Sequence, residues 1–217
     1  VVINNAKLYV NREEGFAGYG LKKDELVSEC SDIDDVLAIT GDGKFVVNRI
    51  SDKSYYGKDI RFIKVFEKND ENTVYNMVYR DGARGDLFIK RFSIGGITRE
   101  KIYDLTKGTE NSKIIYLGIS GTDNAPTIQI VLKPRPKLKN TMFNVNFNEM
   151  LIKNRSAVGN ILTKFPVHKI TEVGKGKSEA SAVKSSEPSK KNDKESEPEL
   201  FEFPKEKSPA EQVKTPT

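Results

Sequence analysis

The residue types that most often carry catalysis or bind metals are scarce in this chain of 217 residues. It contains one histidine, His168, and one cysteine, Cys30. A nucleophile–base–carboxylate triad or a zinc site of the Cys/His type needs more groups than these two residues supply. We therefore expect neither kind of site. We interpret His168 as structural or solvent-facing, and Cys30 as a small strand or loop residue.

Two other patterns resemble functional motifs without their required context. The acidic run Asp32–Asp35 follows Cys30, but it lacks the alternating ligands and the glycine of a calcium loop. Its negative charge raises the pKa of the thiol, which argues against a reactive cysteine. Gly15–Gly20 resembles a phosphate loop, but no βαβ unit follows it. Glycines in a β-rich segment more often mark bulges or a close approach of two backbones.

Basic residues, in contrast, recur at corresponding places after each of three repeated hairpins. Corresponding places in a propeller lie on one face or rim, so these residues are expected to form a continuous track that contacts phosphates without reading bases. Any single one of them is as often an ordinary solvated loop charge. The candidate DNA-binding residues are Lys53, Lys58, Lys90, Arg91, Arg99, Lys101, Lys137, Lys139, Lys153, Arg155, Lys164 and Lys169.

The positive charge of the chain is concentrated in one stretch. The formal net charge is +5, yet residues 126–170 contain eight lysines and arginines against Glu149 alone. The segments before and after this stretch are close to neutral. A concentrated basic region favours a nucleic acid or another anionic surface as the partner.

The elements that must position these residues are short strands. A hairpin returns about every forty residues, which is typical of a propeller or a related β array. Its copies are residues 36–47, residues 75–92, and the two runs 114–117 and 127–132. The first two copies turn at Asp42-Gly43 and Asp81-Gly82, and Asp-Gly supplies the positive φ angles of tight turns.

Altogether the pattern predicts eleven short strands between residues 7 and 165, with no long amphipathic helix. We predict an all-β, propeller-like fold of roughly three blades. Three blades do not close a ring, which needs four or more. The prediction is therefore a partial propeller, with open edges that must be covered or paired.

The composition changes after about residue 170. Residues 171–217 are rich in Ser, Lys, Glu and Pro, so we predict a β domain over 1–170 and a disordered tail over 171–217. Leu200–Pro204 is the apolar exception and a candidate docking motif, although two phenylalanines in such a tail more often have no specific role. No apolar run approaches the roughly twenty residues of a membrane span, so we expect no membrane partner.

Several segments, in order along residues 7–170, resemble the C-terminal domain of the A subunit of bacterial type IIA topoisomerases, the group that contains DNA gyrase and topoisomerase IV. The resemblance is strongest to topoisomerase IV of the Bacteroidetes type. The segments are Glu13–Phe16, Gly20–Glu25, Cys30–Val36, Val78–Gly82, Ile97–Glu100, Tyr103–Gly108, Lys133–Lys139 and Gly159–Lys164.

The resemblance implies a β-pinwheel that bends duplex DNA around a basic rim and presents it to the enzyme core. Arg155–Gly159 is similar to the degenerate basic-glycine boxes of the family, whereas the complete gyrase box is absent. This favours relaxation and decatenation over gyrase-type wrapping. The implied partners are DNA, the ATPase B subunit and the rest of the A subunit, in the cytoplasm with the nucleoid. No cofactor is expected in this chain, while the holoenzyme would use ATP and Mg²⁺.

The chain departs from the family in two respects. The breakage–reunion domain with its DNA-linking tyrosine is missing, so we assign no catalytic residue. The family's domain is usually longer, so the sequence is expected to be either a shortened form or a fragment. A protein-interaction propeller, whose basic loops bind acidic partners, is the alternative function.

Overall fold

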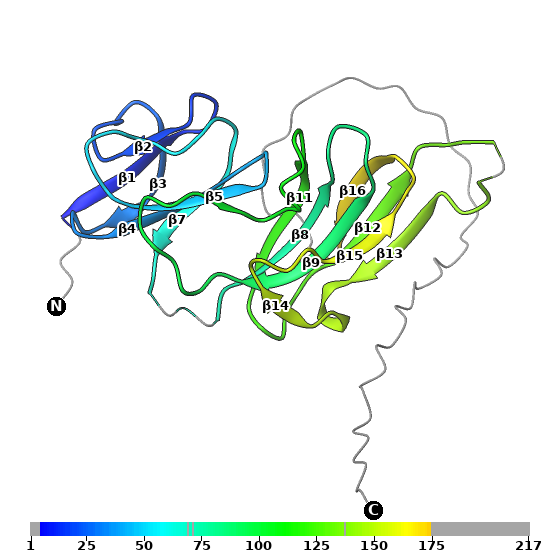
Figure 1. The fold of residues 1–217 in the computed structure, drawn as a ribbon. Helices are drawn as coiled ribbons and strands as arrows, with labels where there is room; N and C mark the ends of the chain where they lie inside the picture. The colour runs from blue at the N-terminus through cyan, green and yellow to red at the C-terminus, as the bar shows by residue number, and fades with distance from the viewer. Residues whose placement is uncertain (1–4, 69, 71, 137, 175–217) are drawn as a thin grey trace, which may run out of the picture.

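The computed structural model describes residues 5–68, 70, 72–136 and 138–174. This part of the chain is built from β-strands and one short 3-10 helix, η1 (Phe147–Glu149). The strands form four separate sheets that follow one another along the molecule, from blue to yellow in Figure 1. No helix within the described ranges is long and apolar enough to cross a membrane.

We number the sheets 1 to 4 in chain order and give their strands from edge to edge. Sheet 1 contains β3 (Glu25–Cys30), β1 (Ala6–Asn11), β2 (Phe16–Gly18) and β6 (Ser54–Tyr55). Sheet 2 contains β7 (Ile60–Phe66), β4 (Asp35–Thr40), β5 (Lys44–Arg49) and β10 (Tyr103–Asp104). Sheet 3 contains β11 (Lys113–Ser120), β8 (Val74–Arg80) and β9 (Leu87–Ser93), with β14 (Ile152–Asn154) and β15 (Asn160–Thr163) both beside β9. Sheet 4 contains β16 (Val167–Val173), β12 (Thr127–Leu132) and β13 (Met142–Asn146).

Each of the first three sheets takes an edge strand from the repeat that follows it. β6 comes after the β4–β5 hairpin of sheet 2, yet it pairs with β2 in sheet 1. In the same way β10 pairs back to β5, and β15 pairs back to β9. We call β6, β10 and β15 the exchanged strands. Their pattern, and the open row of antiparallel sheets, confirm the predicted all-β fold of the pinwheel type.

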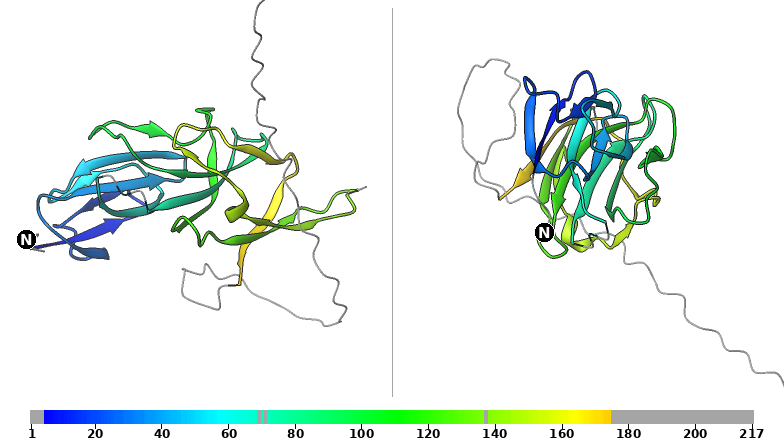
Figure 2. Two further views of the ribbon diagram at one scale, coloured as in Figure 1. Left: turned by 90° about the horizontal axis from the view of Figure 1, so that it is seen from below. Right: turned by 90° about the vertical axis from the view of Figure 1, so that its left-hand side faces the viewer.

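The sheets pack face to face, with a hydrophobic core between each neighbouring pair. In β4, Val36 and Ala38 belong to the core that sheet 2 shares with sheet 1, whereas Leu37 and Ile39 belong to the core shared with sheet 3. A third core, which includes Ile128, joins sheets 3 and 4. Because strand side chains alternate between faces, a sheet buried on both sides needs nearly continuous apolar strands. Figure 2 shows the resulting elongated array, with the first and last sheets at opposite ends.

All eleven predicted strands are present, but the predicted third hairpin is wrong. β11 pairs with β8 in sheet 3, and β12 pairs with β13 and β16 in sheet 4. The described residues form four sheets rather than three blades, because five strands escaped prediction: β3, β6, β10, β14 and β16. β16 continues to Val173, beyond the predicted domain end at residue 170. The predicted disordered tail lies outside the described residues from residue 175 onward.

Gly15 allows the exchanged strand β6 to return to the turn of sheet 1. Its φ is +84°, and a Cβ added there would lie 2.2 Å from the carbonyl oxygen of Gly57. Just before Gly57, the Tyr56 backbone N–H donates to the Gly15 carbonyl at 2.8 Å. The glycine-rich segment is therefore a place of close backbone approach, as the sequence predicted.

Replacing Gly15 by alanine should lower the free energy of unfolding by at least about 2 kcal/mol, because the new Cβ adds both φ strain and a backbone clash. Urea denaturation measures this loss. Gly95→Ala is the matched control, since nothing lies within 4 Å of a Cβ built there. The control should change the unfolding free energy by no more than about 0.5 kcal/mol. Equal losses of unfolding free energy in the Gly15→Ala and Gly95→Ala variants would contradict the interpretation that Gly15 is needed for the close approach of the two backbones.

Candidate nucleic-acid interface

The two ends of the sheets provide different surfaces. The hairpins β1–β2, β4–β5, β8–β9 and β12–β13 all turn at the same end of their sheets. We call this end the turn end, and we call the other end of the sheets the opposite end. The exchanged strands run antiparallel to β2, β5 and β9, so they finish at the turn end. The chain then crosses to the next sheet through residues 56–59, 105–112 and 164–166. The turn end is therefore built from hairpin turns and these three crossovers.

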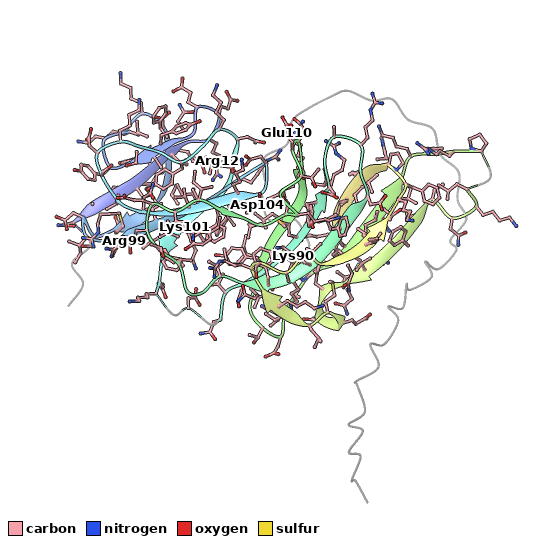
Figure 3. All side chains as sticks on the ribbon, viewed as in Figure 1. Arg12, Lys90, Arg99, Lys101, Asp104 and Glu110 are labelled. Atoms are coloured by element: carbon pink, nitrogen blue, oxygen red, sulfur yellow. The ribbon has the colours of Figure 1, made fainter. Side chains whose placement is uncertain are left out.

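Each crossover carries one exposed lysine, namely Lys58, Lys107 or Lys164. Lys58 and Lys164 belong to the predicted basic track. Lys107 was not among the predicted residues. A shared spacing marks all three lysines, because each comes two positions after a buried apolar residue in or just after an exchanged strand. In Figure 3, Glu110 marks the second crossover at the top of the molecule.

A groove at the turn end of sheets 3 and 4 is lined by basic residues and, among the described residues, by no acidic one. It lies between the β8–β9 turn, the β12–β13 loop and the third crossover, with a volume of about 340 Å³. We call it the basic groove. Its charged lining residues are Arg80, Arg84, Lys133, Arg135 and Lys164. Within the described part of the chain, none of these five side chains forms an ion pair.

Many cations elsewhere are neutralised by carboxylates. Arg12 lies 2.7 Å from Glu25, and its hydrogen bond lowers the pKa of that carboxyl group. Arg99 lies 2.9 Å from Asp35. Like charges that share a groove without counter-charges create a positive potential, which an anionic ligand relieves. The basic groove is therefore a strong candidate for binding phosphates.

A larger cleft of about 720 Å³ adjoins the basic groove and shares Arg80 with it. Lys58 and Lys113 contribute positive charge to this cleft. It is less basic than the groove, because it also contains Asp42 and Asp59. The positively charged surface therefore continues from the groove toward sheet 2, and its net positive charge decreases in that direction.

Five predicted track residues precede the exchanged strands rather than follow them, so their backbones lie on the side of these strands that faces the opposite end. They are Lys53, Arg99, Lys101, Lys153 and Arg155. The prediction of one continuous track is therefore wrong. In Figure 3, the chain can be followed from Arg99 at the left through Lys101 to Asp104, and then up to Glu110.

Several of these opposite-end cations already have partners within the fold. The Lys53 ammonium lies 4.2 Å from the centre of the Phe16 ring. The Arg155 guanidinium lies 4.6 Å from the centre of the Tyr103 ring and donates to the Gly96 carbonyl at 3.1 Å. Such contacts hold the segments that approach the exchanged strands, and they leave these groups less available to a ligand.

Lys90 and Arg91 were predicted to contact phosphates, but the structure buries both side chains, with 1% and 4% of their surface exposed. The Lys90 ammonium donates to the carbonyls of Arg155 and Ala157 at 2.8 and 2.9 Å. The Arg91 guanidinium donates to the Thr122 carbonyl. Because these groups hold loops inside the fold, they cannot reach a surface ligand in this conformation, which corrects the prediction.

The remaining predicted residues have simpler positions. Lys139 is exposed in the β12–β13 loop, of which Lys133 and Arg135 line the basic groove, and Lys169 is exposed on β16. Lys137 lies outside the described residues. The prediction for Cys30 is confirmed: it is buried at the end of β3, where burial, together with the charge of Asp34, raises the pKa of its thiol.

Comparison with known proteins identifies a related group. The family model for the topoisomerase C-terminal domain of the Bacteroidota matches residues 7–174. The chain is also similar to the A subunit of DNA topoisomerase 4 from Borreliella burgdorferi, with 22% identity over 171 residues. This match covers 78% of the chain but 25% of that protein, so the chain spans about a quarter of the relative's length.

Lys90 should make stability depend on pH. Burial lowers its pKa from 10.5 to about 7. Between these two values the unfolded chain binds more protons, so the free energy of unfolding should rise with pH, by up to about 1.4 kcal/mol per pH unit. Lys90→Met should remove this rise. Urea denaturation at a series of pH values between about 7 and 8, below the ionisation of the unfolded cysteine and tyrosines, measures it. The exposed control Lys101→Met should keep the slope, and a Lys90→Met variant with the wild-type slope would contradict the interpretation.

Proposed function

Because the chain belongs to the topoisomerase C-terminal domain family of the Bacteroidota, we propose that it binds and bends duplex DNA as a module of a topoisomerase IV-like A subunit. The observation that carries the proposal is the basic groove. Five cations from three chain segments meet there, no acidic residue of the described part of the chain lines it, and none of the five forms an ion pair with another described residue. The family membership supports the placement in a type IIA topoisomerase. The groove supports DNA as the ligand.

Duplex DNA suits this groove for a physical reason. It carries about one negative charge per 1.7 Å of helix axis, and each neutralised phosphate releases condensed counterions. Arginines and lysines on turns and crossovers contact phosphates without reading base edges. The contacts would therefore give affinity with little sequence preference and a steep dependence on salt.

The position of the groove favours a curved DNA path. DNA seated between the turns of sheets 3 and 4 would continue over the adjoining cleft, where Lys58 and Lys113 supply further contacts. A path that follows the turn ends of successive sheets bends the duplex, and the additional phosphate contacts offset the cost of bending.

In this proposal the chain has no catalytic step of its own. It presents a DNA segment to the strand-passage core for relaxation and decatenation. Strand breakage would belong to the rest of the A subunit, and ATP and Mg²⁺ would be used with the ATPase B subunit. The module would act in the cytoplasm, on the nucleoid.

Charge reversal in the groove tests the DNA site. Arg84→Glu with Arg135→Glu should weaken duplex binding at least tenfold at low salt, equally for unrelated sequences. It should also lower the slope of log K against log salt by about two. Fluorescence anisotropy across a salt series measures affinity, and energy transfer between dyes on the DNA ends measures bending. Lys22→Glu with Lys23→Glu is the matched control, since both lysines are exposed in a loop of sheet 1 and the charge change is equal.

The comparison has three informative outcomes. Equal weakening by the groove variant and the control would mean that net charge, and not the groove, determines binding. A loss confined to a Lys53→Glu, Lys153→Glu variant would place the DNA at the opposite end. Failure of the wild-type chain to bind duplex DNA would contradict the proposal and favour an acidic protein as the partner.

A further inference from the structure

Sheet 4 differs from the other three sheets at one edge. In sheets 1 to 3 the second hairpin strand is bordered by an exchanged strand from the next repeat. In sheet 4 the equivalent strand, β13, pairs with β12, and no described strand lies on its other side. An open edge exposes a row of backbone N–H and C=O groups, and proteins usually pair or cover such an edge.

The spacing of the repeats locates the segment that would fill this edge. An exchanged strand begins 24, 37 or 40 residues after the end of β3, β7 or β11, respectively. The same interval counted from the end of β16 at Val173 spans residues 197–213. This window lies in the C-terminal segment outside the described residues, and it includes the apolar residues Leu200, Phe201 and Phe203.

A side-chain pattern selects one position in this window. In each exchanged-strand region a buried apolar residue is followed two positions later by an exposed lysine. The pairs are Tyr56 and Lys58, Leu105 and Lys107, and Leu162 and Lys164. Between residues 197 and 213 a single apolar residue has a lysine at this spacing: Phe203, followed by Lys205.

The geometry of sheet 4 allows the connection. Thr127 pairs with Asn146 on one side and with Val173 on the other, so β13 and β16 finish at the same end of the sheet. An exchanged strand antiparallel to β13 must begin at that end. The two strands flank β12, about 10 Å apart. The 27 residues from 174 to 200 can span at most about 90 Å, which is ample for this distance.

We propose that residues 201–205 of this same chain form the exchanged strand of sheet 4, antiparallel to β13. The first two exchanged strands place an aromatic ring beside an aromatic ring of their partner: Tyr55 lies 5.2 Å from Phe16, and Tyr103 lies 5.0 Å from Phe45. Phe143 occupies the equivalent position in β13, so an aromatic strand matches the site. The proposal does not depend on DNA binding.

Hydrogen exchange of the full chain tests this pairing. In the wild-type chain all backbone amides of Met142–Asn146 should be protected, including those that point away from β12. Phe201→Asp with Phe203→Asp should increase exchange of the outward amides at least tenfold, while amides of β4 and β5 keep their protection. Glu202→Pro should have the same local effect, because it removes a strand N–H without removing an apolar side chain. The matched control is Val183→Asp with Val213→Asp, which puts two acids elsewhere in the same segment.

Unprotected outward amides in the wild-type chain would overturn the proposal without any variant. Equal β13 exchange in the wild type and in the Phe201, Phe203 variant would also overturn it. Protection that grows with protein concentration, together with a dimer in light scattering, would assign the edge to the segment of a second copy and so contradict pairing within one chain.

Discussion

The exchange of edge strands between consecutive repeats is the constraint on which the rest of this structure depends. Since β6, β10 and β15 run antiparallel to β2, β5 and β9, each brings the chain to the turn end before it enters the next sheet. The crossovers are therefore fixed beside the hairpin turns. Side chains that are far apart in the sequence, such as Arg84, Arg135 and Lys164, meet there for the same reason.

Charge is divided between surface and interior in a way that follows from this architecture. The basic excess of residues 126–170 contributes Lys133, Arg135 and Lys164 to the turn end. Two other cations, Lys90 and Arg91, are buried between sheets, where they donate to carbonyls of incoming segments. A buried lysine lowers stability near neutral pH, and its two hydrogen bonds offset part of that cost.

Much of the fold was predictable because strands such as β4 and β8 are long and strongly apolar. β6 and β10 have two residues each, too few for a periodic pattern, so the exchange itself was invisible in the sequence. The third hairpin was misassigned because β11 and β12 both pair with strands that are distant or separated by a long loop. The repeated hairpin pattern predicted that basic residues occupy corresponding positions in successive repeats. It did not predict that Lys53 and Lys58, on either side of β6, lie at different ends, or that Lys90 is buried.

The central claim is that duplex DNA lies across the turn end of sheets 3 and 4. Acetylation of lysines in the full chain, with and without duplex DNA and read by mass spectrometry, tests it directly. The account predicts that DNA protects the turn-end residues Lys133, Lys139 and Lys164, while the opposite-end residues Lys53, Lys101 and Lys153 react as before. Protection confined to the opposite-end set would contradict it.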